Sequence, residues 1–530
     1  MPPTPVNIPL PAPPAVPEIS PAPPVSSGAR NTYGQILKSS ALIGGSSIVN
    51  IGIGMVRTKA MALLLGTSGV GLMGLYGSIL DLTQSIAGMG VNSSGVRQIA
   101  EAVGSGEGRR IARTAIVLKR TAIVLGILGA LLLILLATPL SFLTFGNGEH
   151  AAAIRTLSLA VFCTAVAGGQ GALIQGMRRI ADLAKLGVIG ALFGTGISIC
   201  LIYFFREKGI VPSLVSIAAM AILTSWWFSR KVQIEPQSLT VSELRHEAGT
   251  LLKLGFAFMA SAVLTTGAAY AIRLIVLRTV SFEAAGLYQS AWAIGGLYVG
   301  LILQAMGADF YPRLTAIAKD NVECNRLVNE QAQISLLLAG PGVIGTLTFA
   351  PLVIALFYTS KFVAAVEILR WICLGMALRV IAWPMGYIVL AKGVQTIFFW
   401  TEVAATIVHV GLAWVFIHTF GLGGAGMAFF GLYVWHGFLI YFIVRRLSGF
   451  RWSVANRNLG VLTLSLIGLV FCGIIFLPFW LATTLGIVAA TVSGVHSIRL
   501  LLKLVPIDRL PSPVRRLLIL FRFATVVASK

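Results

Sequence analysis

The chain has 530 residues, of which 57% are hydrophobic and only 11% are charged. This composition and a mean hydropathy of +0.88 exclude a soluble globular protein, in which roughly 25% of residues carry a charge. A net charge of +22 would suggest a nucleic-acid partner in a soluble protein, but in a membrane protein basic cytoplasmic loops account for it. We therefore expect an integral membrane protein with no nucleic-acid partner.

Residues 1–35 are expected to form a disordered cytoplasmic tail. The first 24 of them hold 11 of the chain's 22 prolines, and proline-rich segments favour extended conformations without a packed core. No apolar stretch follows a basic start, so a secretory signal peptide is not expected.

Apolar segments then recur along the whole chain. A helix that crosses a bilayer needs about 20 residues, and fourteen segments meet this requirement. They predict an all-α polytopic membrane protein, and Pro341, Pro351 and Pro384 are compatible with breaks in some of its spans. The predicted spans are 38–64, 69–93, 121–145, 153–176, 186–205, 210–228, 254–278, 286–310, 334–357, 364–390, 396–419, 423–445, 459–478 and 481–502.

Most Lys and Arg residues fall in the tails and in alternate loops between these spans. Only three fall in loops on the opposite side: Arg206, Lys208 and Lys361. Because basic loops stay in the cytoplasm, we expect both termini there. The basic stretch 96–120 is expected to lie as a loop against anionic lipid headgroups.

Two stretches six spans apart share a pattern. The first contains GLYGS at 74–78 and the second GLYQS at 286–290, and a basic residue precedes each: Arg57 by 17 residues and Arg273 by 13. Because an even number of spans separates the two motifs, the two halves run in the same direction, as in transporters built from parallel repeats. This predicts two parallel six-helix bundles around a central cavity, with two additional helices at the C-terminus.

The repeat also sets the expected domain boundaries. A first bundle at 36–228 and a second at 254–446 are joined by a cytoplasmic connector at 229–253. An additional transmembrane hairpin follows at 447–505, and a basic amphipathic helix at 506–530 is expected to lie on the membrane surface.

Basic residues inside predicted spans are the candidates for substrate binding. A charge at the centre of a membrane helix costs roughly 2.5–3.5 kcal/mol, so such residues usually face a polar interior. Arg57, Lys59, Arg273 and Arg379 meet this description, and the repeat places Arg57 opposite Arg273 across the cavity. Lys59 lies about 200° from Arg57 around a helix of 3.6 residues per turn, so both line one cavity only if the span bends. The alternative is that Arg57 and Lys59 extend to the outer headgroups.

The acidic residues Asp81 and Glu402 also lie inside spans. Each is interpreted either as a counter-ion to a cavity arginine or as a proton or sodium site coupled to transport. His409 and His436 are expected to be buried neutral imidazoles bonded to backbone or hydroxyl groups. An excess of Arg and Lys over carboxylates in the cavity would favour an anionic ligand, and the planar guanidinium group suits phosphate.

The motifs of several enzyme classes are missing from the sequence. It contains no phosphate-binding GxxxxGK[ST] loop, no HExxH motif and no cluster of carboxylates for a metal ion. The longest internal loop is about 25 residues, which is too short for a nucleotide-binding domain. We therefore expect a carrier or channel, not an enzyme, with no cofactor and no metal site.

The segment LKSSALIGGSSIVNIGIGMVRTKAMALLLGTSGVGLMGLYGSI (37–79) resembles the start of Wzx-type O-antigen translocases. These are lipid-linked oligosaccharide flippases of the multidrug/oligosaccharidyl-lipid/polysaccharide exporter superfamily. GLYQSAWAIGGLYVGLILQAMGADFYPRL (286–314) resembles their eighth span, and the resemblance covers about residues 36–446. In related flippases, cationic residues of the first span and of its second-half counterpart bind pyrophosphate, and Arg57 and Arg273 match these positions.

The resemblance implies a specific function. Such proteins move a polyprenyl-pyrophosphate-linked oligosaccharide, the repeat unit of O-antigen or of a related surface polysaccharide, across the bacterial inner membrane by alternating access. It implies the lipid-linked substrate, membrane lipids, a polysaccharide polymerase and glycosyltransferases as partners. Two other functions stay open: a cation-coupled multidrug antiporter of the same superfamily, whose cavity should be acidic and aromatic, and a structural membrane scaffold without a cavity.

Overall fold

The computed structural model describes residues 27–105, 107–232 and 240–504. In these ranges the chain forms helices and no strand, and the predicted amphipathic tail 506–530 and most of the predicted tail 1–35 lie outside them. The helices are α1 (Ser27–Ala87), α2 (Val91–Ser105), α3 (Gly108–Phe145), α4 (Ala151–Gly176), α5 (Ile180–Phe205), α6 (Ile210–Ser229), α7 (Val241–Thr279), α8 (Phe282–Ala305), α9 (Tyr311–Ala316), α10 (Asn321–Thr348), α11 (Ala350–Phe357), α12 (Ala365–Ala391), α13 (Gln395–Phe420), α14 (Gly423–Ser448), α15 (Val454–Phe476) and α16 (Phe479–Leu504).

Eleven continuous helical stretches in the described residues are long and apolar enough to cross a membrane. Two of them, Gly45–Ala87 and Ile180–Ser229, contain a break and are long enough for two crossings each. A further crossing comes from the bent pair α10 and α11, whose axes differ by 81°. The helices are therefore compatible with the fourteen predicted spans.

Helix α1 consists of two arms that meet at Gly66. This residue has φ 68° and ψ −165°, a backbone conformation that favours glycine because it has no Cβ. The second arm starts beside Gly286 at the beginning of α8, and the residues after it pass beside Gly255 in the first part of α7. The chain therefore reverses direction at Gly66, in the gap between the predicted spans 38–64 and 69–93.

The prediction of a basic loop at 96–120 is wrong. Helix α2 covers its first part and α3 begins at Gly108. The buried positions of α2 are Val91, Ser94, Gly95, Ile99 and Ala102, a spacing of three and four residues that gives the helix one buried face. The charged residues occupy the other face, so the stretch is helical although it is too polar to cross a membrane.

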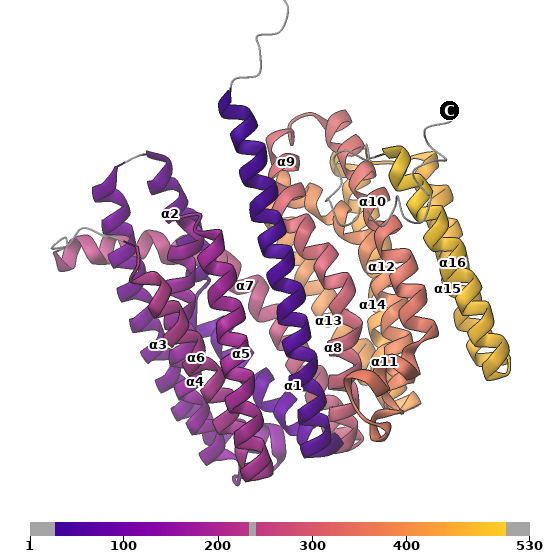
Figure 1. Ribbon diagram of the computed structural model, residues 1–530, viewed down its shortest axis with the longest axis horizontal. Coiled ribbons are helices and arrows are strands. Elements are labelled where there is room, and N and C mark those ends of the chain that lie inside the picture. Colours follow the sequence, from indigo (N-terminus) through magenta and orange to yellow (C-terminus); the bar gives the residue numbers. More distant parts are fainter. Residues whose placement is uncertain (1–26, 106, 233–239, 505–530) are drawn as a thin grey trace, which may run out of the picture.

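The helices form two groups on either side of α1 (Figure 1). In the first group, α3 packs on α4, and α6 packs on α4 and α5; in the second, α14 packs on α12 and α13, and α12 also packs on α8 and α10. Helix α1 contacts α5 in the first group and α8 in the second. Helix α7, labelled on the first group's side of α1 in Figure 1, contacts α1 and also helices of both groups. The last pair, α15 and α16, packs mainly on α10 at the edge of the molecule.

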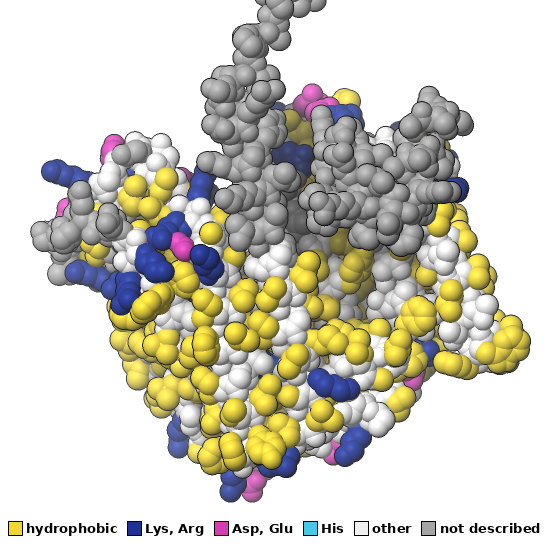
Figure 2. Space-filling view, viewed as in Figure 1, with side chains coloured by type: hydrophobic (Ala, Val, Ile, Leu, Met, Phe, Trp, Pro, Cys, Tyr) yellow, Lys and Arg dark blue, Asp and Glu magenta, His cyan; other side chains and the backbone are white. Residues whose placement is uncertain are grey.

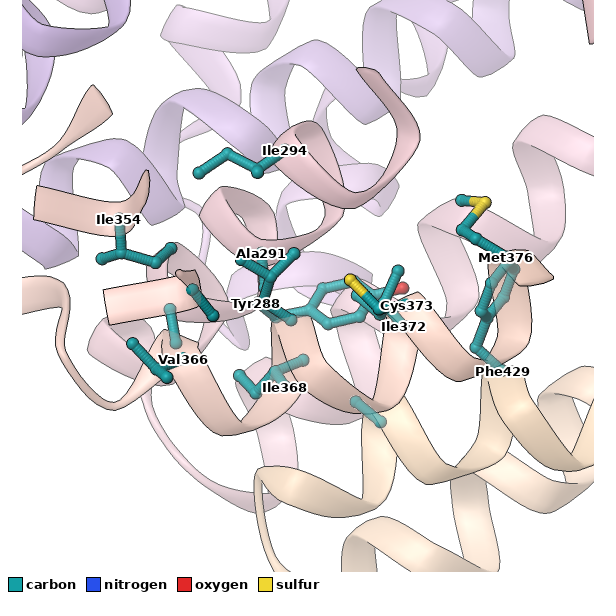
Figure 3. Close-up of a cluster of buried hydrophobic side chains, with 14 of the residues drawn as sticks. Tyr288, Ala291, Ile294, Ile354, Val366, Ile368, Ile372, Cys373, Met376 and Phe429 are labelled. Atoms are coloured by element: carbon teal, nitrogen blue, oxygen red, sulfur yellow. The ribbon is translucent and has the colours of Figure 1, made fainter. Parts of the chain in front are cut away.

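The largest buried cluster lies where α8, α12 and α14 meet. Figure 3 shows Tyr288 and Ala291 of α8 against Ile372 and Cys373 of α12, and Phe429 of α14 lies near by. This cluster also includes residues of both arms of α1. The core therefore holds α8 and α12 firmly in place, and these helices present side chains to the cavity described below.

Hydrophobic side chains cover most of the face in Figure 2, and charged ones lie mainly toward its upper and lower edges. Large apolar residues such as Leu135, Phe204 and Phe479 are more than 70% exposed, as expected of surfaces that face lipid. We call the end with the links 177–179, 392–394 and 449–453 and with residues 230–232 the basic end, because it carries Arg178, Arg179, Arg230, Lys231, Lys392 and Arg451. The other end, with the links 146–150, 206–209, 280–281 and 421–422, is called the opposite end.

Candidate functional site

A cavity lies in the interior between the second arm of α1 and helices α7, α8, α12, α13 and α14. It has two adjoining compartments of about 330 and 320 Å³, and each reaches the lower end of the size range typical of ligand pockets. The first compartment is lined mainly by Ser78, Asp81, Thr266, Arg273, Tyr288, Trp292, His409 and Phe429. The second is lined mainly by Ser261, Tyr387, Phe398, Thr401 and Ile440. Both share Thr265, Arg379, Trp383, Glu402 and His436.

Arg273 is held in a fixed orientation on the wall of the first compartment. Its Nε donates a hydrogen bond of 2.8 Å to Oε1 of Gln289, and its Nη1 donates one of 3.2 Å to the carbonyl oxygen of Ala269. Gln289 belongs to the second repeated motif, and its side chain lies against Gly74 of the first motif. The two motifs found in the sequence therefore meet beside the arginine that precedes one of them.

Arg379 lies between the two compartments. Its guanidinium carbon is 4.7 Å from the centre of the Trp383 ring and 5.7 Å from that of Tyr433, within the range of a cation–π interaction. Its Nε is buried and has no hydrogen-bond partner. The rings thus hold the guanidinium group while leaving donors available to a ligand.

The cavity is balanced in charge, which differs from the excess of positive charge that was expected. Asp81 and Glu402 line it together with Arg273 and Arg379, and each carboxyl group interacts electrostatically with one of the arginines. Among the described residues no ion pair within 4.0 Å joins them. The guanidinium groups therefore keep hydrogen-bonding capacity for a ligand.

The structure does not place Arg57 and Lys59 among the residues that line this cavity. Both lie on the first arm of α1, whereas Ser78 and Asp81 of the second arm line the cavity. The guanidinium Nε of Arg57 is buried without a hydrogen-bond partner. The expectation that Arg57 faces Arg273 across the cavity is therefore not met, because α1 folds back at Gly66 and puts its other arm there.

Lys59 instead joins the first arm of α1 to the end of α11, at the opposite end. Its ammonium group donates hydrogen bonds to the carbonyl oxygens of Ala355 and Tyr358, at the end of α11. Ala355 lies in the last turn of α11 and Tyr358 directly follows the helix, where carbonyl groups lack a partner within the helix. Lys59 thus neither lines the cavity nor ends in free solvent.

Substitution of Lys59 by Met is expected to destabilise the protein without reducing substrate binding. The substitution removes an exposed hydrogen bond to Ala355 and leaves the partly buried carbonyl of Tyr358 unsatisfied, and an unsatisfied buried acceptor costs about 1–3 kcal/mol. A lower midpoint of thermal unfolding in detergent, with transport retained at moderate temperature, is the expected result. Lost transport at unchanged thermal stability would instead assign Lys59 to substrate binding.

Several cavity residues were not among the predicted site residues: Trp292, Trp383, Tyr387, Phe429 and Tyr433. A usable signal was present in α12, where Arg379, Trp383 and Tyr387 recur every four residues and so share one helix face. His409 and His436 were expected to be bonded to backbone or hydroxyl groups. In the structure, Nε2 of His409 and Nδ1 of His436 are buried without a partner.

At the opposite end, α1 and α8 are in close backbone contact. A Cβ atom added at Gly286 of α8 would overlap the carbonyl oxygen of Thr67, and one added at Gly71 would lie 2.5 Å from that of Phe282. Near by, Tyr270 of α7 shares a 2.6 Å hydrogen bond with Thr144 of α3. Glycine at both positions lets the two backbones touch, so the cavity is sealed there.

An aromatic stack adds to this seal. The ring centres of Phe145 and His150 are 3.8 Å apart, and Phe145 is stacked in turn on Phe282 of α8 at 6.1 Å. Nδ1 of His150 lies 2.7 Å from the hydroxyl of Tyr76. Burial lowers the pKa of the His150 imidazole below its ordinary value, which favours the neutral ring that stacks well at neutral pH.

Helix α7 contacts the residues after α1 and helix α3 at the basic end. Gly90, which follows α1, lies against Gly255 of α7. A Cβ added at Gly90 would overlap the carbonyl oxygen of Gly255, and one added at Gly255 would overlap that of Met89. Arg113 of α3 pairs with Glu247 of α7 at 3.3 Å and with Glu243 at 3.8 Å. These ion pairs are partly exposed and contribute only about 0–1 kcal/mol each, so this closure depends mainly on α7.

The long apolar helices define a polytopic membrane protein, and its fold is shared with transporters of known structure. Solved structures with this fold include "Lipid II flippase MurJ, inward closed conformation", with a TM-score of 0.66 and 15% identity, covering 88% of this chain and 100% of that one. An inward-facing multidrug resistance MATE family transporter of the MOP superfamily gives a TM-score of 0.60 at 17% identity, covering 76% of this chain and 98% of that one. All of these comparisons concern transporters and not enzymes.

The family is shown by the sequence itself. The model of the family described as "Polysaccharide biosynthesis protein" matches residues 60–367, more than half of the chain, so the chain belongs to this family. It is 25% identical over 409 residues to the lipid III flippase of Escherichia coli (strain K12), which covers 75% of this chain and 95% of that protein. The same values hold for the lipid III flippase of Shigella flexneri.

Proposed function

We propose that the protein is a flippase for a polyprenyl-pyrophosphate-linked oligosaccharide. The family is one of polysaccharide biosynthesis, and relatives that align over three quarters of the chain are lipid III flippases. The observation that carries the proposal is the cavity between the second arm of α1 and the helices of the second half, in which Arg273 and Arg379 present oriented guanidinium groups. Guanidinium groups suit the diphosphate of such a lipid.

In the proposed mechanism, the diphosphate is bound mainly by Arg273 and Arg379, and Arg57 joins them when the helices rearrange. The prenyl chain remains in the lipid. The domain division is proposed to be 36–228 and 254–446, with rocking of these halves opening the cavity to each side in turn. Asp81 and Glu402 act as counter-ions to the arginines until the diphosphate replaces them, and the substrate thereby stabilises one arrangement more than the other.

The charge distribution supports an orientation. Basic residues gather at the basic end, and such residues mark the cytoplasmic side, so both termini are proposed to lie there. The substrate is proposed to be the repeat unit of O-antigen or of a related surface polysaccharide, moved across the bacterial inner membrane. Glycosyltransferases would supply this substrate and a polymerase would consume it.

Complementation tests the proposed function. The chain is expressed in bacterial strains that lack the flippase for an O-antigen or another lipid-linked repeat unit. Restored surface polysaccharide, seen by gel electrophoresis and antibody staining, is the expected result. A protein that reaches the membrane in normal amounts but restores no polysaccharide in any of these strains would contradict the proposal.

The second candidate is a cation-coupled multidrug antiporter. It is favoured by the aromatic walls of the cavity and by its two carboxyl groups, Asp81 and Glu402, and the fold is shared with multidrug transporters. Raised resistance to lipophilic cations on expression, lost on Asp81→Asn and without any effect on polysaccharide, would favour this function. No change in drug resistance would leave the flippase as the better account.

A further inference from the structure

The second compartment of the cavity is built by one half of the chain alone. All of the residues that line it belong to α7, α12, α13 and α14, whereas the first compartment also includes Ser78 and Asp81 from α1. We propose that the second compartment is a saccharide subsite, which binds the uncharged, hydroxyl-rich sugar next to the diphosphate. This inference rests on the proposed flippase function. It assigns the sugar to the second compartment and the diphosphate to the first.

Unsatisfied polar atoms converge on the cavity: Arg379 and His436 belong to the wall that the second compartment shares with the first, and His409 lines the first compartment near by. Three buried side-chain atoms without a hydrogen-bond partner are Nε of Arg379, Nε2 of His409 and Nδ1 of His436, each on a different helix. Buried polar groups are almost always hydrogen-bonded, and leaving one unsatisfied costs about 1–3 kcal/mol. Three such atoms around one cavity therefore indicate a polar ligand that donates and accepts hydrogen bonds.

The walls between these polar atoms are aromatic. Trp383 and Tyr387 of α12 lie on one side with ring centres 6.2 Å apart, and Phe398 of α13 lines the same compartment. A pyranose ring has an apolar C–H face and polar hydroxyl groups at its edge. Aromatic rings beside a few placed polar groups match that combination, in the way that apolar pockets with a few polar groups fix a ligand's orientation.

The charge of the compartment fits a neutral ligand. Its lining includes one guanidinium group, on Arg379, and one carboxyl group, on Glu402. Glu402 can accept two hydrogen bonds from neighbouring hydroxyl groups, and a neutral His436 can donate one and accept one. The first compartment offers two guanidinium groups, on Arg273 and Arg379, so we assign the diphosphate to the side of Arg273.

The wall shared by the two compartments indicates how the diphosphate and the first sugar are arranged. Because Arg379, Trp383, Glu402 and His436 line both compartments, a ligand with one group in each compartment would contact these four side chains with both groups. Arg379 then lies at the junction and can contact both the diphosphate and the first sugar. The half of the protein with residues 254–446 would thus determine which sugars are transported.

Binding of two lipids that differ only in the sugar tests this assignment. Purified full-length protein in detergent is mixed with one of two lipids. The first is undecaprenyl diphosphate, and the second is the undecaprenyl-diphosphate-linked oligosaccharide, extracted from the flippase-deficient strain used for complementation. Dissociation constants are measured by native mass spectrometry. The variants are Glu402→Gln, His436→Leu and Arg273→Ala. His418→Leu is the matched control, because His418 lies outside both compartments and bonds to the carbonyl of Trp414.

Glu402→Gln and His436→Leu are expected to weaken binding of the glycosylated lipid roughly tenfold, the factor that corresponds to 1.4 kcal/mol. Neither should weaken binding of undecaprenyl diphosphate, because the diphosphate displaces Glu402 from the arginines and does not bind to it. Arg273→Ala should weaken both, and His418→Leu neither. Equal losses for both lipids in the Glu402 and His436 variants, or no loss for either, would overturn the saccharide subsite. Wild-type protein that binds neither lipid would instead overturn the proposed function itself.

Discussion

Arg273→Ala is expected to abolish most transport of the lipid-linked oligosaccharide. The guanidinium group contributes hydrogen bonds to a charged ligand that are worth about 1.5–3 kcal/mol each, and no other arginine on the first compartment's wall has the same position. Arg273→Lys should retain part of the activity, because an ammonium group keeps the charge but loses the planar pair of donors. The measurement is surface polysaccharide in the complemented strain, normalised to the amount of protein in the membrane.

The control for this prediction is Arg155→Ala. Arg155 also lies in a membrane helix, but it is exposed and donates a 3.1 Å hydrogen bond to Thr138 on α3, outside the cavity. Gln289→Leu should have an intermediate effect, because it removes the acceptor that orients Nε of Arg273 without removing the charge. Wild-type transport by Arg273→Ala would show that this arginine does not bind the substrate.

Gly286→Val is expected to prevent the opposite end from closing. Any Cβ at this position overlaps the carbonyl oxygen of Thr67, and the obstacle is backbone, which cannot rotate away as a side chain could. Overpacking of this kind costs about 1–3 kcal/mol, all of it in the closed arrangement. Transport should fall strongly, because a cavity that stays open on one side cannot alternate.

Labelling of Ser78→Cys with a membrane-impermeant maleimide measures this opening. The variant is made in a background without the five native cysteines, and Ser78 lines the cavity. Reagent added from outside the cell should label it faster in Gly286→Val than in the parent. Gly300→Val on the same helix is the control, because nothing lies within 4 Å of its added Cβ; equal labelling in all three proteins would contradict the seal.

Much of the fold could be predicted from the sequence, since span length and hydropathy are local properties. The gap between spans 38–64 and 69–93 coincides with the break at Gly66, and the repeated motifs at 74–78 and 286–290 are in contact. Stretch 96–120 was misjudged because hydropathy separates membrane from water but does not separate a polar helix from a loop.

The site was predicted only in part. Arg273, Arg379, Asp81 and Glu402 do share one cavity, because a charge inside a span is a strong local signal for a polar interior. Lys59 could not be placed in this way, since its partners in α11 are 296 and 299 residues away in the chain. Helical spacing predicts which residues share a face but not which helix that face meets.

The most direct test of the account is transport by the purified protein. The full chain is reconstituted into liposomes that carry the undecaprenyl-diphosphate-linked oligosaccharide, and a membrane-impermeant glycosidase reports how much of it reaches the outer leaflet. We predict that wild-type protein raises the accessible fraction above that of protein-free liposomes and that Arg273→Ala does not. Wild-type protein that leaves the accessible fraction at the protein-free level, or an Arg273→Ala variant that moves the lipid as fast as the wild type, would contradict the account.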